Sequence, residues 1–193
     1  MVMMEQIVLL DDAGRAIGSA EKAASHHRDT PLHLAFSCHV FDAADRVLLT
    51  RRAAVKRTWP GVWTNSFCGH PGPGEGLSAA VYRRARSELG VEVSDLRLVL
   101  PGFRYRAVMD DGTVEHECCP VVTARLDDQA QGLAPDPAEV ADVRWCAWGD
   151  ALSIVAGETS PWFALQRGLL AEFGAPSAWP PGDPRELPEA IGW

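Results

Sequence analysis

Residues 69–90, GHPGPGEGLSAAVYRRARSELG, carry the clearest helix signal in the chain. Apolar side chains recur at every fourth position from Leu77 to Leu89, which places them on one face of a helix. Ser78 is suited to cap the start, and Gly90 is suited to stop the end. We therefore predict an amphipathic helix over residues 78–89, with its apolar face packed on a sheet.

Short apolar runs bounded by turn residues predict strands on both sides of this helix. They cover residues 7–10, 35–41, 47–50, 96–100, 103–108, 115–125 and 143–148. A second helix is predicted over residues 161–173, with Pro161 at its first position. This order of elements indicates an α+β fold in which helices flank a mixed β-sheet, as a single domain over residues 1–173.

The last twenty residues differ in composition from the rest of the chain. Residues 174–193 contain five prolines and three glycines, which is too many for a regular element. We predict a Pro-rich C-terminal tail there, in which Trp179 and Trp193 either pack on the domain or belong to a frayed end.

The overall composition limits the classes of partner. The 193 residues include 26 acidic and 18 basic side chains, a net charge of −8, and 47% of them are hydrophobic. A chain of this size and composition can bury one core, and its acidic total predicts neither a nucleic-acid partner nor a membrane partner. Five cysteines that include the adjacent pair Cys118 and Cys119 favour a reducing compartment. With no signal-peptide pattern at residues 1–10, we expect a cytoplasmic protein.

Three separate stretches contain side chains that could bind a metal. They supply His26, His33, Cys68, His70, Glu115 and Glu117. On extended backbone, residues two apart point to the same face, so Cys68 with His70, and Glu115 with Glu117, could each serve one pocket. Imidazoles and carboxylates together suit Mn²⁺ or Mg²⁺, and Zn²⁺ accepts the same ligands. Taken singly, such histidines and glutamates are more often solvated, and a cysteine is more often an inert buried thiol.

The spacing of Gly69, Glu75, Arg83, Glu88 and Gly90 resembles the Nudix box, a loop, helix and loop whose glutamates bind metal beside a diphosphate. Two of the expected carboxylates are absent, because Arg84 and Ser87 occupy their positions. Hydrolysis of a diphosphate by clustered metal ions is therefore not expected. Arg84 and Glu88, four residues apart, could form one face of a diphosphate platform or an ordinary surface ion pair.

A basic run at residues 51–57, RRAAVKR, precedes the tryptophan-rich stretch 58–65. Four cations within seven residues suit a phosphate clamp, and the tryptophans suit an apolar pocket wall. Nucleic-acid binding is the rival interpretation, but the chain has no further basic stripe.

Together these stretches resemble the type I isopentenyl-diphosphate Δ-isomerases, a Nudix-fold family, over residues 7–173. The resemblance lies in TPLHLAFS (30–37), WPGVWTN (59–65), CGHP (68–71), ELGV (88–91), FRYRA (103–107), EHE (115–117) and SPW (160–162). It implies an enzyme of isoprenoid precursor synthesis that interconverts isopentenyl and dimethylallyl diphosphates through a tertiary carbocation. The implied partner is a small prenyl diphosphate, and the implied assembly is a monomer or homodimer.

The resemblance also implies roles for individual residues. The implied catalytic residues are Cys68 and Glu117, with Tyr105 in the proton relay and Trp162 against the carbocation. The implied ligands of a first ion, Mn²⁺, Mg²⁺ or Zn²⁺, are His26, His33, His70, Glu115 and Glu117. Glu88 would hold a second ion, Mg²⁺, with the substrate diphosphate, which Lys22, Arg52, Lys56 and Arg84 would also contact. His116 is expected to face away from the site because strand side chains alternate, and His27 adjoins His26 without fitting the family spacing.

Two other functions use some of the same residues. A Nudix hydrolase would release phosphate or pyrophosphate, whereas an isomerase releases neither. A non-catalytic diphosphate-binding module would be expected to lack Cys68 or Glu117, and both are present. The unrelated flavin-dependent isomerase is not indicated, because no Gly-rich dinucleotide motif is present.

Overall fold

The computed structural model describes residues 5–126, 132–154 and 157–193. The strands in these ranges are β1 (Gln6–Leu10), β2 (Ala16–Glu21), β3 (His33–Leu34), β4 (Phe36–Phe41), β5 (Arg46–Arg52), β6 (Trp63–Thr64), β7 (Phe67–Gly69), β8 (Ser94–Leu100), β9 (Arg104–Val108), β10 (Val114–Cys118), β11 (Val121–Arg125) and β12 (Val140–Ala147). The helices are α1 (Lys22–Ser25), α2 (Leu77–Leu89), α3 (Trp148–Leu152) and α4 (Pro161–Ala171), followed by 3₁₀ turns at Pro176–Ala178 and Pro184–Glu186.

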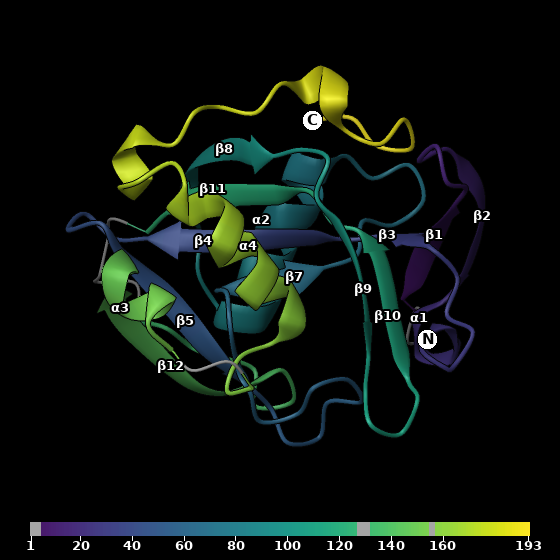
Figure 1. The fold of residues 1–193 in the computed structure, drawn as a ribbon, viewed down its shortest axis with the longest axis horizontal. Helices are drawn as coiled ribbons and strands as arrows, with labels where there is room; N and C mark the ends of the chain where they lie inside the picture. The colour runs from purple at the N-terminus through teal and green to yellow at the C-terminus, as the bar shows by residue number, and fades with distance from the viewer. Residues whose placement is uncertain (1–4, 127–131, 155–156) are drawn as a thin grey trace.

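The described strands form two mixed sheets (Figure 1). One has the order β2-β1-β3-β10-β9, and the other has the order β12-β5-β4-β11-β8, with β6 paired to β5 and β7 paired to β4. The pairs β3/β10 and β4/β11 are parallel, and the remaining pairs are antiparallel. Because β3 leads directly into β4, and β10 leads into β11, the two parallel pairs join the sheets. The predicted α+β architecture with a mixed sheet and flanking helices is confirmed.

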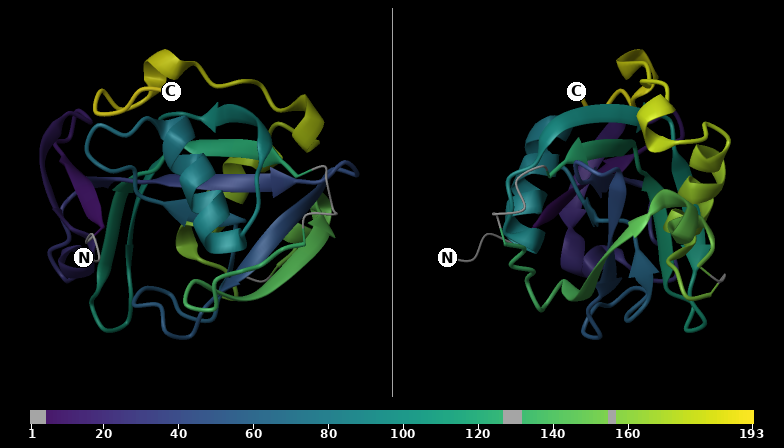
Figure 2. Two further views of the ribbon diagram at one scale, coloured as in Figure 1. Left: turned by 180° about the vertical axis from the view of Figure 1, so that it is seen from behind. Right: turned by 90° about the vertical axis from the view of Figure 1, so that its left-hand side faces the viewer.

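Helices cover the larger sheet on opposite sides, with α2 on one and α4 on the other (Figure 2). The apolar face of α2 belongs to one core cluster, together with Phe36 and Phe67. Trp148 at the start of α3 and Phe163 on α4 belong to a second cluster. Each fully buried side chain of this size stabilises the fold by about 1.5–3 kcal/mol, so both layers are firmly held to the sheet.

The predicted central helix is confirmed, but its N-terminal cap is not the predicted one. The helix begins at Leu77, after the N-cap residue Gly76, so Ser78 lies inside it and does not cap it. The backbone N–H of Leu77 instead donates to the carbonyl of Gly192, at 2.9 Å. At the other end Gly90 adopts a φ of +69°, a left-handed conformation that favours glycine.

The prediction of one continuous strand over residues 115–125 is wrong. The chain forms β10 up to Cys118 and β11 from Val121, and the two strands lie in different sheets. Pro120 lies at the break, where it has no N–H to donate to a strand ladder. The second predicted helix is confirmed from Pro161, capped by Ser160, but it ends at Ala171 rather than at residue 173.

The C-terminal segment 174–193 runs over β8 and past the end of α2, as the yellow trace in Figure 1 shows. Trp179 is only 2% exposed, and Ile191 joins the core cluster under α2. The N–H of Gly182 donates to Leu98 of β8 at 2.8 Å, and the N–H of Ala190 donates to Gly14 at 3.1 Å. None of the helices in the described part of the chain is both long and apolar enough to span a bilayer.

Candidate functional site

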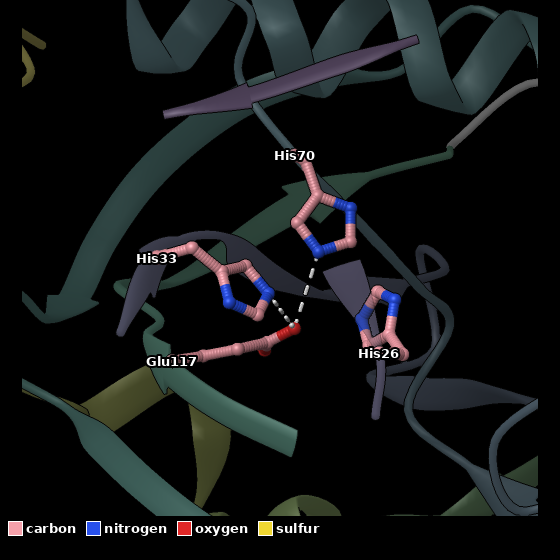
Figure 3. A group of neighbouring side chains, drawn as sticks. All are labelled: His26, His33, His70 and Glu117. Carbon is pink, nitrogen blue, oxygen red and sulfur yellow. Dashed lines mark hydrogen bonds and ion pairs between the residues drawn. The ribbon is translucent and has the colours of Figure 1, made fainter. Parts of the chain in front are cut away.

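Glu117 lies at the centre of a row of polar side chains across three strands. It pairs with His33 of β3 on one side and with Tyr105 of β9 on the other. Its Oε1 lies 3.2 Å from Nε2 of His70 and 3.4 Å from Nε2 of His33 (Figure 3). Its Oε2 accepts a 2.9 Å hydrogen bond from the Tyr105 hydroxyl. The two carboxylate oxygens therefore face different groups.

Four of the five side chains expected at the first metal come together. His26, His33, His70 and Glu117 are all buried, and each offers one ligand atom within 4.8 Å of the others. They come from the segment after α1, from β3, from the residue after β7 and from β10 (Figure 3). Glu115 lies outside this group of four, with Oε2 3.1 Å from Nε2 of His26. The group could hold a metal ion.

The hydrogen-bond pattern of the histidines fits a cation. Nδ1 of His33 lies 2.9 Å from the carbonyl of Pro31, which can only accept, so the imidazole proton sits on Nδ1. Nε2 of His33 faces Glu117 and has no hydrogen-bond partner among the described residues. Burial opposes the charged form of this ring, but the neighbouring Glu117 carboxylate raises its pKa. Burial lowers the pKa of His70 to about 3, so that ring is neutral. Imidazoles oriented by a backbone carbonyl beside a carboxylate are the usual surroundings of a protein-bound metal.

Cys68 lies on β7, directly opposite Ser37 of β4. Its Sγ accepts a hydrogen bond from Nδ2 of Asn65 at 3.3 Å and lies 3.4 Å from Oγ of Ser37. Burial raises the pKa of the Cys68 thiol to about 11. Burial acts in the same direction on Glu117, but the imidazoles of His33 and His70 hold its pKa well below its usual range. The site therefore contains a thiol and an ionised carboxylate at neutral pH.

One pocket of about 420 Å³ brings these groups together with the basic side chains. Cys68, Glu117 and Tyr105 line it together with Trp162 of α4. The Trp162 ring lies 5.7 Å from that of Tyr105, and its Nε1 donates to Oδ1 of Asn65 at 3.1 Å. These contacts hold the indole in place at the pocket.

The four expected diphosphate contacts, Lys22, Arg52, Lys56 and Arg84, also line this pocket. The Arg52 guanidinium is held by the backbone carbonyls of Thr58 and Trp59, and its Cζ lies 5.1 Å from the centroid of the Trp162 ring. Arg84 pairs with Glu88, the expected ligand of a second ion, through a 2.8 Å hydrogen bond from its Nε. Gly69 permits the arginine to pass, because a Cβ there would lie 2.7 Å from Cγ of Arg84.

Glu5 and Glu139 are pocket carboxylates that the sequence patterns did not single out. Lys22 pairs with Glu5 at 2.9 Å, and Lys56 pairs with Glu139. Glu139 also lies 3.5 Å from Arg84. Helix α2 lacks two carboxylates of the Nudix pattern. Glu5, before β1, and Glu139, before β12, bring two other carboxylates to the same pocket. No local motif marks them, since they are distant in sequence from the cations that they pair with.

His116 and His27 lie outside the cluster. His116 is half-buried and pairs with Arg106 across β10 and β9, while its neighbours Glu115 and Glu117 are buried. His27 is exposed, and its Nδ1 accepts a hydrogen bond from the N–H of Asp29 at 3.1 Å. Neither belongs to the group that could hold a metal.

The chain is similar to a known family and to named proteins over most of its length. The family model described as the NUDIX domain matches residues 31–166. An isopentenyl-diphosphate Delta-isomerase of Saccharopolyspora erythraea is 55% identical over 97% of this chain and 97% of its own length. Relatives of the same name from Mycolicibacterium vanbaalenii and Rhizobium rhizogenes are 58% and 47% identical, over 88% and 96% of this chain and 93% and 90% of their own lengths.

Solved structures share the fold at low sequence identity. A Deinococcus radiodurans protein superposes with a TM-score of 0.64 at 19% identity, covering 87% of this chain and 98% of its own. A MutT protein from Methanosarcina mazei gives a TM-score of 0.59 at 16% identity, covering 75% of this chain and 96% of its own. These likenesses concern the fold alone.

Proposed function

The chain belongs to the isopentenyl-diphosphate Δ-isomerases, a family with the Nudix fold, and we propose that Cys68 and Glu117 carry its reaction. It is an isomerase that interconverts isopentenyl diphosphate and dimethylallyl diphosphate in isoprenoid metabolism. Its substrate is therefore a small molecule with a five-carbon apolar end and a diphosphate end. The observation that carries the proposed residue roles is that one pocket joins a thiol and a carboxylate to a cationic region.

The reaction moves a carbon–carbon double bond in two proton transfers. A proton is added to the terminal methylene, which leaves a tertiary carbocation, and a proton is then removed from the carbon two bonds away. An alkene is a very weak base, so the acid must be held against it where water cannot capture the cation. Of Cys68 and Glu117, one donates while the other accepts, and their different resting protonation states suit a pair with opposite roles.

Two aromatic residues support this assignment. Tyr105 donates to Glu117 at 2.9 Å, and burial raises its pKa well above the usual value, so it stays a phenol and can pass a proton at the carboxylate. Trp162 presents an indole in the same pocket. A desolvated cation over an indole face is stabilised by about 2 kcal/mol, which suits a tertiary carbocation.

We further propose two divalent ions. His26, His33, His70 and Glu117, with Glu115 beside His26, would hold Mn²⁺, Mg²⁺ or Zn²⁺, and Glu88 would hold Mg²⁺ with the diphosphate. When bound, the first ion supplies positive charge that tunes the basicity of Glu117, and the second neutralises phosphate charge. The neutral imidazole of His70 and the ionised Glu117 support the first site. Lys22, Arg52, Lys56 and Arg84 anchor the diphosphate, and this remote binding energy holds the five-carbon end in place.

The location and assembly are also proposals. We expect a cytoplasmic enzyme, because all five cysteines are free, including the adjacent Cys118 and Cys119. We expect a monomer or a homodimer, the assembly that the resemblance of the sequence implies.

Product analysis tests the proposed roles. Purified protein is incubated with isopentenyl diphosphate and Mg²⁺ or Mn²⁺, with and without chelator. The wild type should form dimethylallyl diphosphate without releasing phosphate or pyrophosphate, and chelator should stop turnover. Cys68→Ala and Glu117→Gln should each abolish turnover while the fold is retained. Cys146→Ala, which changes a half-buried cysteine of β12 outside the pocket, should turn over like the wild type.

The same reaction in D₂O tests the order of proton addition and removal. Protonation from exchangeable groups should place deuterium in the new methyl group of dimethylallyl diphosphate. Turnover without deuterium in that methyl group contradicts the proposed mechanism, and wild-type activity in Cys68→Ala or Glu117→Gln contradicts the role of that residue.

A further inference from the structure

A buried series of hydrogen-bonded neutral side chains leads from the second core cluster to the sulfur of Cys68. Ser37 is fully buried and pairs with Cys68 across β4 and β7. Its Oγ lies 3.4 Å from Sγ of Cys68 and 3.4 Å from Sγ of Cys119. The Ser37 hydroxyl is therefore within hydrogen-bond distance of two thiols.

The direction of the hydrogen bonds is fixed by the groups behind Ser37. Nε2 of Gln166, on α4, donates to Oγ of Ser37 at 2.8 Å. The Gln166 carbonyl oxygen can only accept, so Nε2 of His39, 3.1 Å away, is the donor. Because the Ser37 oxygen already accepts from Gln166, its own proton is free to point at a sulfur. Every donor in the series His39, Gln166, Ser37 thus points toward Cys68 or Cys119.

Burying the polar ring of His39 costs free energy unless its N–H contributes to this series of hydrogen bonds. It is fully buried among the rings of Trp148, Phe163 and Trp179, and its Nδ1 has no hydrogen-bond partner among the described residues. Burial lowers its pKa to about 4, so the ring is a neutral donor at physiological pH. A hydrocarbon ring would fill the same space without an unpaired nitrogen. Its polar role is to hold the Gln166 amide in one orientation.

We propose that Ser37, oriented by Gln166 and His39, is a positioning residue that donates a hydrogen bond to the Cys68 sulfur when the thiol has given up its proton. The inference rests on the proposed role of Cys68 in the reaction. In either direction of a reversible isomerisation the sulfur passes between thiol and thiolate, so negative charge appears on it in one of these states. A donor already aimed at the sulfur stabilises that charge without reorganisation.

This arrangement predicts an effect on turnover rather than on binding. Ser37 is not one of the residues that line the pocket, whereas Lys22, Arg52, Lys56 and Arg84 are. An interaction that strengthens only as charge develops lowers the barrier and leaves ground-state affinity unchanged. Neighbouring hydrogen bonds in a buried series polarise one another, so Gln166 and His39 strengthen the final donor.

The experiment compares Ser37→Ala, Gln166→Met and the double variant with a matched control. Ser66→Ala is the control, because Ser66 is equally buried and loses two hydrogen bonds, to Val40 and Leu48, without touching a sulfur. Steady-state kinetics with isopentenyl diphosphate, thermal unfolding, and the solvent deuterium isotope effect on kcat are measured for each variant.

We expect Ser37→Ala to lower kcat about ten- to a hundredfold with KM changed less than about twofold, and to raise the solvent isotope effect. Gln166→Met should lower kcat by less, and the double variant should resemble Ser37→Ala, because Gln166 acts through Ser37. Ser66→Ala should lose stability and keep kcat and the isotope effect.

Three results overturn the inference: an unchanged kcat in Ser37→Ala, an effect confined to KM, or a fall in kcat with an unchanged isotope effect, as a smaller folded fraction would give. Failure of the proposed function would give a different result. Either the wild type would not form dimethylallyl diphosphate, or Cys68→Ala would stay active. If the wild type and Cys68→Ala behave as expected and Ser37→Ala has normal kinetics, only the role proposed for Ser37, Gln166 and His39 is wrong.

Discussion

The Tyr105 hydroxyl donates to Oε2 of Glu117 across strands β9 and β10, while Oε1 of the same carboxylate faces the histidine cluster. One side chain thus joins the histidine cluster, which could hold a metal, to the tyrosine that lines the same pocket. The strand register produces this arrangement, because it places His33, Glu117 and Tyr105 side by side on adjacent strands.

Removing only the Tyr105 hydroxyl should slow the reaction and spare the fold. The buried Tyr105→Phe ring keeps its packing, so the free energy of unfolding should fall by no more than about 1 kcal/mol. The hydrogen bond to Glu117 is lost, and kcat should fall about ten- to a hundredfold if the phenol takes part in proton transfer. Steady-state kinetics measure this, with Tyr82→Phe as the control, since Tyr82 is the other tyrosine and lies outside the pocket. Equal activity in both variants would exclude a role for the hydroxyl.

The histidine cluster should bind one divalent ion per chain with an affinity that depends on His33. His33→Ala removes a ligand whose ring is already oriented by the Pro31 carbonyl, so Mn²⁺ should bind more than about tenfold more weakly. Equilibrium dialysis with metal analysis of the chelator-treated protein measures this without relying on activity. His27→Ala should bind like the wild type, because His27 is exposed and lies outside the cluster. Equal affinity in both variants would show that His33 is not a ligand.

The sequence motifs led to every proposed catalytic residue and to every proposed metal ligand except His26, which lies outside the quoted motifs. They did not lead to Ser37, Gln166 and His39 as a group, nor to Glu5 and Glu139. Gln166 is more than a hundred residues from Ser37, and α4 brings the two together only through tertiary packing. Glu139 reaches Lys56 across a similarly long separation. Periodicity and motif spacing are local properties, so they contain no information on such contacts.

Glu139 should weaken the binding of a diphosphate that carries no metal. It pairs with Lys56 and lies 3.5 Å from Arg84, so it neutralises cations that the substrate needs. Glu139→Gln should therefore bind inorganic pyrophosphate more tightly in the absence of divalent ions, by about fivefold for a change of about 1 kcal/mol. Calorimetric titration measures this affinity. Glu92→Gln is the control, because Glu92 pairs with Arg86 on the exposed surface outside the pocket. Weaker or equal binding by Glu139→Gln would contradict the prediction.

The fold was predicted well where a local signal is strong and poorly where long-range contacts decide it. The helix over residues 78–89 has both an apolar stripe and a terminal glycine, and its boundaries differ by only one residue. The break at Pro120 divides the run of residues 115–125, and only the sheet pairing shows that its halves belong to different sheets. The packing of residues 174–193 depends on Trp179 and Ile191, two apolar side chains in a segment of turn-forming composition.

We propose that the C-terminal segment is part of the folded domain, and Trp179 tests this. Its indole is 2% exposed, packs on Trp148 and Phe41, and donates through Nε1 to the carbonyl of Gly174 at 3.1 Å. Trp179→Ala should lower the free energy of unfolding by about 3–5 kcal/mol, the usual cost of a large cavity in a core. Urea unfolding followed by circular dichroism measures this.

The other C-terminal tryptophan provides the comparison. Trp193 is 44% exposed, so Trp193→Ala should change the free energy of unfolding by no more than about 0.5 kcal/mol. A frayed tail would make both substitutions neutral, because neither indole would be buried in the folded state. A large loss of unfolding free energy for Trp179→Ala alone would instead show that the C-terminal segment packs over β8. This packing brings the Gly192 carbonyl to the first N–H of α2, the helix that carries Arg84 and Glu88.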